Sequence, residues 1–90
     1  MTVAETLNAA ADYLEQHGWC QGQMFGPDDS VCAVGAIAEV TRADTDYDHY
    51  SEALEVAMSY VGGGPVSQWN DAPGRTKEDV IAMLRAAAEE

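Results

Sequence analysis

The sequence contains two cysteines and two histidines, whose thiol and imidazole groups could bind a metal ion. His17 and Cys20 are three positions apart, and Cys32 and His49 lie further along the chain. Thiolate and imidazole groups are common zinc ligands, so these four residues form the candidate set for a zinc site. Structural zinc sites usually contain two closely spaced ligand pairs, and only His17 and Cys20 are closely spaced here. The spacing therefore favours ordinary thiols and imidazoles, and we assign no zinc ligands.

Cys32 is also the candidate nucleophile. It stands near the start of an expected helix, where the helix dipole can favour a thiolate. Asp28 and Asp29 come just before it, and their negative charges oppose thiolate formation. Free cysteine is among the most frequently buried residue types, so we expect Cys32 to be a core residue and assign no catalytic residue. A disulfide between Cys20 and Cys32 would satisfy the geometry but is not expected in a reducing compartment.

An acidic segment at residues 44–48 (DTDYD) offers a second metal pattern, with Glu55 at its twelfth position. This spacing of carboxylates matches the calcium loop of an EF-hand. His49 occupies the sixth position, where that loop requires glycine for a sharp turn. Tyr50 and Leu54 continue a helical period through the same residues. Carboxylates at the positive end of a helix dipole explain the pattern, so neither a metal nor a cofactor is assigned.

Trp69, Asp71 and Arg75 are the candidate functional residues, in a segment rich in turn-forming types. Tryptophan and arginine are enriched at the hot spots of protein interfaces, so interaction with a partner is one interpretation. Loop anchoring is the other, with the indole packed on the core and Arg75 paired with Asp71. We favour anchoring because small domains seldom leave a tryptophan in water.

The candidate residues must be positioned by helices, and two of these helices are predicted at the ends of the chain. Thr2 and Glu5 match a capping box, in which each side chain bonds to the other residue's backbone N–H. Thr76 and Asp79 repeat the pattern near the C-terminus. Apolar residues at helical spacing follow both caps and recur in two stretches between them. They predict helices near residues 2–17, 30–40, 46–61 and 76–89.

The longest apolar run, residues 31–38, predicts a buried central helix with Ser30 as its N-cap. Gly35 within this run is expected to let a neighbouring helix approach closely. Residues 62–64 are three glycines followed by Pro65, which ends the third helix. The triglycine lacks the lysine and the serine or threonine that a phosphate-binding loop would need.

Residues 19–29 and 66–75 are the expected connections, because both are rich in glycine, proline, aspartate or asparagine. Trp19, Met24 and Phe25 are too apolar for a loop fully in water, so we expect the first connection to lie across the core. A short strand at residues 23–25 has no evident partner. Four helices with these links predict a compact all-α single domain over residues 1–90, orthogonal or bundle-like.

The charge balance narrows the classes of partner. Sixteen acidic residues against four basic ones give a formal net charge of −12. Direct binding to nucleic acid usually needs a basic stripe, and an anionic membrane would repel this chain, so neither is expected. No stretch resembles a signal peptide or a spanning helix. Two cysteines are too few for a disulfide framework, which predicts a reduced, cytoplasmic protein.

Four short segments together resemble an uncharacterised family of small proteins from actinobacteria and their bacteriophages. They are residues 18–22 (GWCQG), 32–37 (CAVGAI), 69–71 (WND) and 74–76 (GRT), and the resemblance extends over about residues 10–84. No activity is established for that family, so the resemblance transfers no catalytic residue. It implies an origin as an actinobacterial or phage accessory protein.

We therefore predict a non-enzymatic cytoplasmic protein that acts by binding an unidentified protein partner, with homodimerisation as a further option. No cluster of nucleophile, base and cofactor motif is evident. An acidic mimic of nucleic acid, occupying a DNA-binding protein, is the first alternative. Such a mimic needs carboxylates concentrated on one face, and here they are spread over all four expected helices. A small-molecule or metal-dependent enzyme is the remaining alternative.

Overall fold

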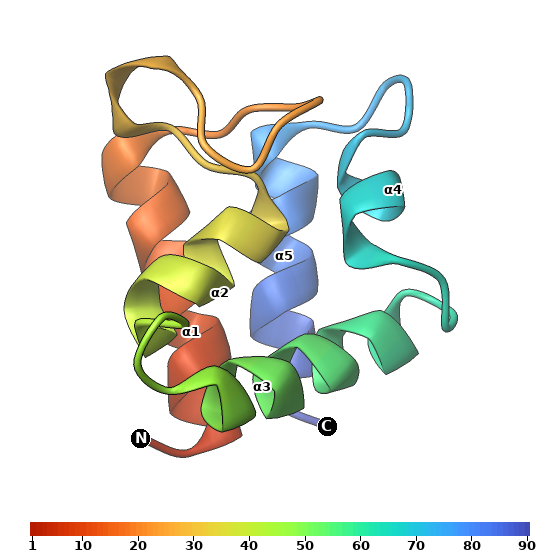
Figure 1. The fold of residues 1–90 in the computed structure, drawn as a ribbon. Helices are drawn as coiled ribbons and strands as arrows, with labels where there is room; N and C mark the ends of the chain where they lie inside the picture. Colours follow the sequence, from red (N-terminus) through yellow and green to blue (C-terminus); the bar gives the residue numbers. More distant parts are fainter.

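The computed structural model describes residues 1–90 and contains α-helices, one short 3-10 helix and no sheet (Figure 1). The all-α prediction is confirmed, since four of the five α-helices have seven or more residues. No helix combines the length and the apolar character needed to cross a membrane. The elements are α1 (Val3–His17), η1 (Pro27–Asp29), α2 (Ala33–Thr41), α3 (Tyr47–Tyr60), α4 (Val66–Asn70) and α5 (Lys77–Ala87).

Both predicted capping boxes are present, and they set the starts of α1 and α5. The Thr2 hydroxyl accepts a hydrogen bond from the Glu5 N–H at 3.1 Å, and the Thr2 N–H donates to the Glu5 carboxylate at 2.8 Å. Thr76 and Asp79 make the same reciprocal pair, with both distances 3.1 Å. Because these bonds satisfy N–H groups that lack partners inside the helix, they fix where each helix begins.

The start of α2 differs from the prediction. The helix begins at Ala33, and the Cys32 sulfur, rather than the Ser30 hydroxyl, accepts from the Gly35 N–H at 3.4 Å. Val31 is held outside the helix because its backbone forms isolated bridges with Trp19 and Phe25. Ser30 was wrong as the N-cap, since its hydroxyl donates to the Pro27 carbonyl and closes η1 instead.

The close neighbour of Gly35 is also not the expected helix. A Cβ atom built on Gly35 would collide with the carbonyl oxygen of Met24 and would lie 3.2 Å from the Val31 Cβ. The Met24 carbonyl is fixed there because it accepts a hydrogen bond from the Cys32 N–H at 3.1 Å. The first connection therefore lies across the start of α2, whereas Phe25, which was expected to avoid water, is 51% exposed.

α4 is a helix that the sequence analysis did not predict, within a segment expected to be a loop. Pro65 precedes it with extended backbone, and the Pro65 carbonyl accepts from the Gln68 and Trp69 N–H groups. Val66 and Asn70, one turn apart, are both buried and turn the same side of α4 inward. The burial of this face explains the helix, because five residues alone would not hold a helix in water.

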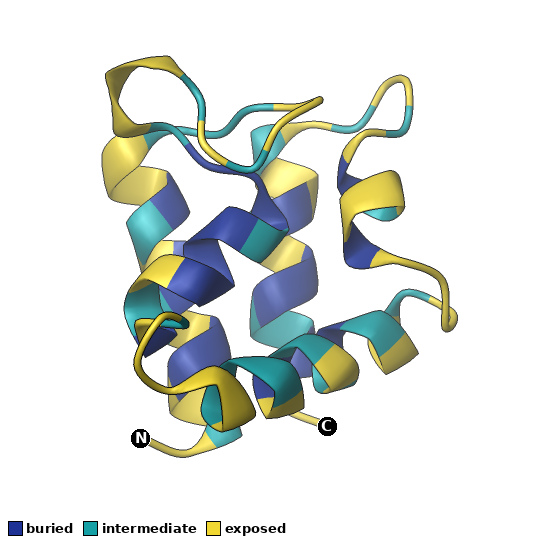
Figure 2. Ribbon diagram, viewed as in Figure 1, coloured by how far each residue is buried: buried dark blue, intermediate teal, exposed yellow.

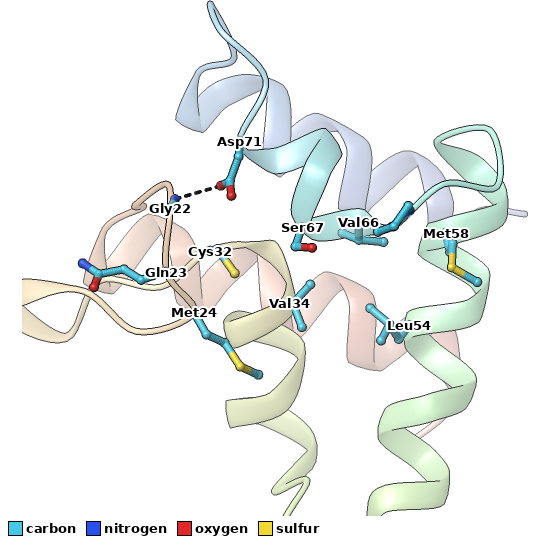
Figure 3. Close-up of a pocket in the computed structure, with 11 residues that line it drawn as sticks. Gly22, Gln23, Met24, Cys32, Val34, Leu54, Met58, Val66, Ser67 and Asp71 are labelled. Carbon is cyan, nitrogen blue, oxygen red and sulfur yellow. Dashed lines mark hydrogen bonds between the residues drawn. The ribbon is translucent and has the colours of Figure 1, made fainter.

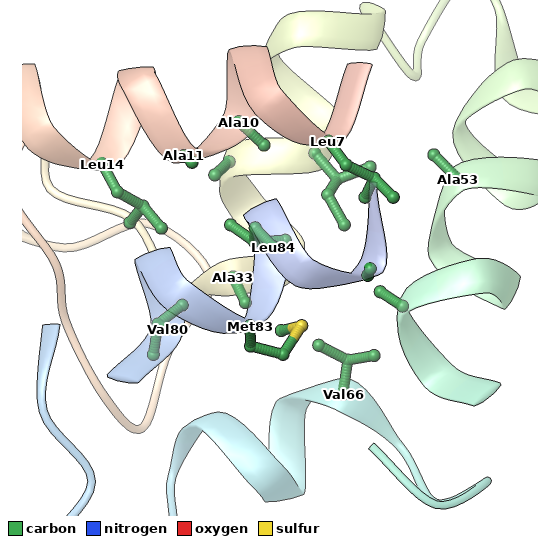
Figure 4. Packing of buried hydrophobic residues seen from close by; sticks show 14 of the residues in the cluster. Leu7, Ala10, Ala11, Leu14, Ala33, Ala53, Val66, Val80, Met83 and Leu84 are labelled. Atoms are coloured by element: carbon green, nitrogen blue, oxygen red, sulfur yellow. The ribbon is translucent and has the colours of Figure 1, made fainter. Parts of the chain in front are cut away.

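A hydrophobic cluster of 15 buried residues occupies the centre of the molecule. α1 makes its most extensive contacts with α5 and α2, and α3 lies across the end of the molecule where both termini are found (Figures 1 and 2). Val66 of α4 points toward Met83 of α5 (Figure 4). Many members are alanines, which allow the helix backbones to approach closely. The cluster is Leu7, Ala10, Ala11, Leu14, Val31, Ala33, Ala36, Ile37, Ala53, Ala57, Val66, Val80, Met83, Leu84 and Ala87.

Candidate functional site

Asn70, at the last position of α4, is the centre of a buried hydrogen-bond network. Its side chain is fully buried, and its Oδ1 accepts from the indole Nε1–H of Trp19 at 2.7 Å and from the Ala33 N–H at 3.0 Å. Its Nδ2 donates to the Cys20 carbonyl at 3.1 Å and to Asp71 Oδ1 at 2.9 Å. The amide therefore uses both its donors and accepts twice, and it also satisfies the first N–H of α2.

Asp71 and Gln21 extend this network toward the surface. Asp71 Oδ1 accepts from the Gly22 N–H at 3.0 Å, and Gln21 Nε2 donates to the Asn70 and Ala72 carbonyls at 3.0 and 3.2 Å. The Gly22 N–H, with help from the Asn70 amide, lowers the pKa of Asp71 below its ordinary value of 3.8. We call these contacts, between residues 19–22 and residues 70–72, the loop clamp.

The loop clamp brings together two of the segments that carry the family resemblance. Residues 18–22 and 69–71 lie far apart in the sequence, yet the hydrogen bonds of Asn70, Asp71 and Gln21 join them directly. The asparagine of the WND segment was not among the predicted functional residues. The one available signal was its position between Trp69 and Asp71, and an asparagine in a turn-rich segment more commonly caps or turns than becomes buried.

Trp69 and Arg75 lie together on one side of α4 and Asp71 lies on another, so the expected pair between Asp71 and Arg75 does not form. The Arg75 guanidinium instead lies over the Trp69 ring, 3.8 Å from its centroid, and its Nε–H donates to the Trp69 carbonyl at 2.8 Å. Trp69 is half-buried and packs against the core. Together with the exposed Tyr60, Trp69 and Arg75 line a shallow hollow between α3, α4 and α5.

A larger hollow, which we call the α4 pocket, lies on the Asp71 side of this helix. Its volume is about 460 Å³, and residues 22–24, α2, α3 and α4 surround it. Met24, Val34, Leu54 and Met58 are half-buried, and their side chains gather around the same space (Figure 3). Asp71 lies at the rim, where the dashed bond in Figure 3 joins it to Gly22. The loop clamp thus fixes the position of one wall relative to another.

The Cys32 thiol faces this pocket but has the character of a buried group. Cys32 is 4% exposed, and burial raises the pKa of its thiol while hydrogen bonds from the Gly35 and Val34 N–H groups act in the opposite direction. Cys32 and Cys20 are both free, and the Cys20 thiol donates to the Gln23 carbonyl. A thiol whose pKa is raised in this way is a poor nucleophile at neutral pH.

The two histidines have partners elsewhere. His49 Nε2 and Thr6 Oγ1 are 2.6 Å apart in a hydrogen bond between α3 and α1. His17 stacks on Tyr13 along α1, with ring centroids 4.1 Å apart. Asp46, from the acidic segment, caps α3 by accepting from the His49 N–H at 3.3 Å. No group of three or more His, Cys, Asp or Glu side chains is placed to hold a metal ion.

The fold and these contacts define a small all-α protein in which a short fourth helix is fastened to a distant loop beside an apolar pocket. The chain belongs to a family of unknown function (DUF6197), whose model matches residues 1–90. The expectation of an uncharacterised family is therefore confirmed. A comparison with curated proteins gave no match, and a comparison with solved structures also gave none.

Proposed function

We propose that this protein acts by binding another protein and that the α4 pocket is the contact surface. The observation that carries the proposal is the pocket itself, in which half-buried apolar side chains from a loop and two helices surround about 460 Å³. Apolar surface gathered in one hollow with a polar rim is typical of binding sites. Met24 and Met58 in its walls are flexible and polarisable, which suits a surface that adapts to a partner.

The surroundings of the pocket support a binding role in two ways. The loop clamp holds residues 22–24 against α4 before any partner arrives, and this reduces the ordering cost of binding. On the other side of α4, Trp69, Arg75 and the exposed Tyr60 are residue types enriched at interface hot spots. In this proposal Trp69 and Arg75 anchor α4 and also extend the contact surface.

The reactive side chains favour binding over catalysis. The buried Cys32 has a raised thiol pKa, and the hydrogen-bonded contacts of His49 are with Thr6 and Asp46. Nucleophilic catalysis by a thiol needs an adjacent base or a lowered pKa. We propose a cytoplasmic setting because two free cysteines suit a reducing compartment. The proposed origin in an actinobacterium or its phage rests on the family resemblance alone.

A photo-crosslinking experiment tests the proposed function. Benzoylphenylalanine in place of Ser67, an exposed residue at the pocket rim, should give a discrete protein adduct in lysate of the cells that encode the chain. The same group in place of Gln16, which is exposed on α1 outside the pocket, is the matched control. An adduct with the mass of two chains would identify a second copy as the partner. Equal labelling from both positions, or none from Ser67, would contradict the proposal.

A further inference from the structure

One wall of the α4 pocket carries apolar side chains at helical spacing. Leu54 and Met58 are one turn apart on α3, so their half-buried side chains form a stripe along one wall. Val34 of α2 and Met24 of the connection belong to the facing part of the lining (Figure 3). Amphipathic helices bind in grooves of this kind by inserting apolar residues spaced one turn apart.

The charges around the pocket indicate the sign of the charge that a partner should carry. Arg85 pairs with Asp12 and Glu15 on α1, and Lys77 lies against the Glu15 carbonyl. The two other basic residues, Arg42 and Arg75, line different hollows, so no basic side chain lines the α4 pocket.

The one ionisable carboxylate at the pocket is Asp71. Its Oδ1 is occupied by the loop clamp, and its Oδ2 has no hydrogen-bond partner within the protein. The net charge of −12 adds a long-range attraction for basic partners and a repulsion for acidic ones.

We propose that the α4 pocket binds a basic amphipathic helix of the partner protein. Apolar side chains of that helix insert between Leu54 and Met24, and one of its lysine or arginine residues lies against Asp71. This inference rests on the proposed function and specifies the chemistry of the partner. The apolar residues of the helix lie along the stripe on α3. Its basic face meets the exposed Asp71 carboxylate at the rim.

A synthetic amphipathic helix with leucine and lysine at helical spacing, acetyl-LKKLLKLLKKLLKL-amide, is the probe, and the same peptide with glutamate for lysine is its control. Calorimetric titration should give saturable binding of the lysine peptide at near-physiological salt and none of the glutamate peptide. Amide NMR shifts of the labelled protein should change mainly at residues 22–24, 54–58 and 66–71. Shifts spread over the surface, or confined to another region, would overturn the inference.

Charge-changing substitutions distinguish a specific ion pair at Asp71 from the general attraction of a basic peptide to the negatively charged protein. Ser67→Lys places a positive charge at the rim, and it should weaken peptide binding about tenfold, which corresponds to ~1.4 kcal/mol. Ser59→Lys makes the same change on an exposed position outside the pocket and should alter affinity less than about twofold. Since neither hydroxyl makes a hydrogen bond within the protein, both variants should melt like the parent. Equal effects of the two substitutions would show diffuse attraction and overturn the inference.

Apolar variants test the groove itself. Leu54→Gln should weaken binding at least about tenfold because it removes apolar contact from the centre of the stripe. Ile81→Gln, at a half-buried aliphatic residue in another hollow, is the matched control and should leave affinity within about twofold. Loss of binding in both variants, with both still folded, would overturn the inference.

The two proposals fail in different ways. If the Ser67 crosslinker captures a protein but the lysine peptide does not bind in the pocket, the proposed function stands and the basic helix is wrong. If the crosslinker captures nothing in excess of the Gln16 control, the proposed function fails, whatever the peptide does.

Discussion

α1 and α5 are joined mainly by apolar side chains, whereas α4 is joined to residues 19–22 by hydrogen bonds. Leu7 and Leu14 of α1 meet Val80 and Leu84 of α5 in the core, and Arg85 adds surface ion pairs (Figure 4). The loop clamp instead depends on one buried amide, Asn70. Apolar packing weakens gradually when one atom group is lost, but loss of the residue at the centre of a hydrogen-bond network leaves several buried or half-buried partners unsatisfied at once. The two regions should therefore respond differently to substitution.

The largest expected effect is on Asn70. Asn70→Ala leaves the buried Ala33 N–H and the half-buried Trp19 indole N–H and Cys20 carbonyl without their partner; a fully buried group of this kind costs about 1–3 kcal/mol and a half-buried one less. We expect the free energy of unfolding, measured by urea denaturation, to fall by about 4 kcal/mol. Asn8→Ala, at an exposed asparagine that bonds to Arg85, should change it by less than about 0.5 kcal/mol. A similar small loss in both variants would remove the distinction between the two regions.

Gly35→Ala tests the close approach between α2 and the first connection. The added methyl group would collide with the Met24 carbonyl, which is fixed by its bond to Cys32. Overpacking of this kind costs about 1–3 kcal/mol, and we expect a loss of about 2 kcal/mol in urea denaturation despite the better helix propensity of alanine. Gly64→Ala is the control, because its added Cβ meets nothing within 4 Å. Equal stability of the two variants would mean that the connection is free to move away.

Trp69→Ala measures how much of the α4 attachment is apolar. The half-buried indole packs on the core and under Arg75, so we expect a loss of about 2 kcal/mol, less than for a fully buried aromatic residue. Arg75→Ala should cost about 1 kcal/mol through loss of the stack and of the bond to the Trp69 carbonyl. Thermal melts of the two variants provide the measurement. A parent-like melt for Trp69→Ala would assign this residue to partner binding alone.

The smallest expected effect concerns acid stability at Asp71. Its pKa is lowered in the folded state, mainly by the Gly22 N–H, so its contribution is complete above its ordinary value of 3.8. That contribution is lost as the pH falls through the lowered folded value. Asp71→Asn should therefore lose less stability than the parent between pH 5 and pH 3, as measured by urea denaturation at each pH. An unchanged pH dependence would show that the exposed carboxylate is fully screened by water.

The predictable parts of the fold are those whose signal is local in sequence. Thr2 and Glu5, like Thr76 and Asp79, lie within one turn of each other, so a short pattern is enough to identify their capping boxes. The apolar periods of α1, α3 and α5 are likewise contained within each helix. Three of the four long helices therefore matched their expected positions closely.

The parts that were missed depend on contacts between distant residues. α4 forms because Val66 and Asn70 are buried by other elements, and α2 starts late because Val31 pairs with Trp19 and Phe25. Similarly, Asp71 bonds to the Gly22 N–H, which lies in a distant segment of the sequence, whereas Arg75 stacks on Trp69. The α4 pocket could not be predicted either, since its lining combines residues from four separate segments. Composition established the net charge of −12 but not where the apolar surface lies.

The attachment of α4 through Asn70 also has a consequence for the order of folding. The partners of the Asn70 amide include Trp19 and the first residue of α2, so its hydrogen bonds need both already in place. α4 has only five residues and cannot persist before this docking. α4 should therefore dock onto the rest of the protein after the transition state for folding. A substitution that disrupts its attachment should raise the unfolding rate and leave the refolding rate nearly unchanged. Transient openings of the native state would then release α4 first and uncover the apolar walls of the pocket while α1 and α5 stay paired.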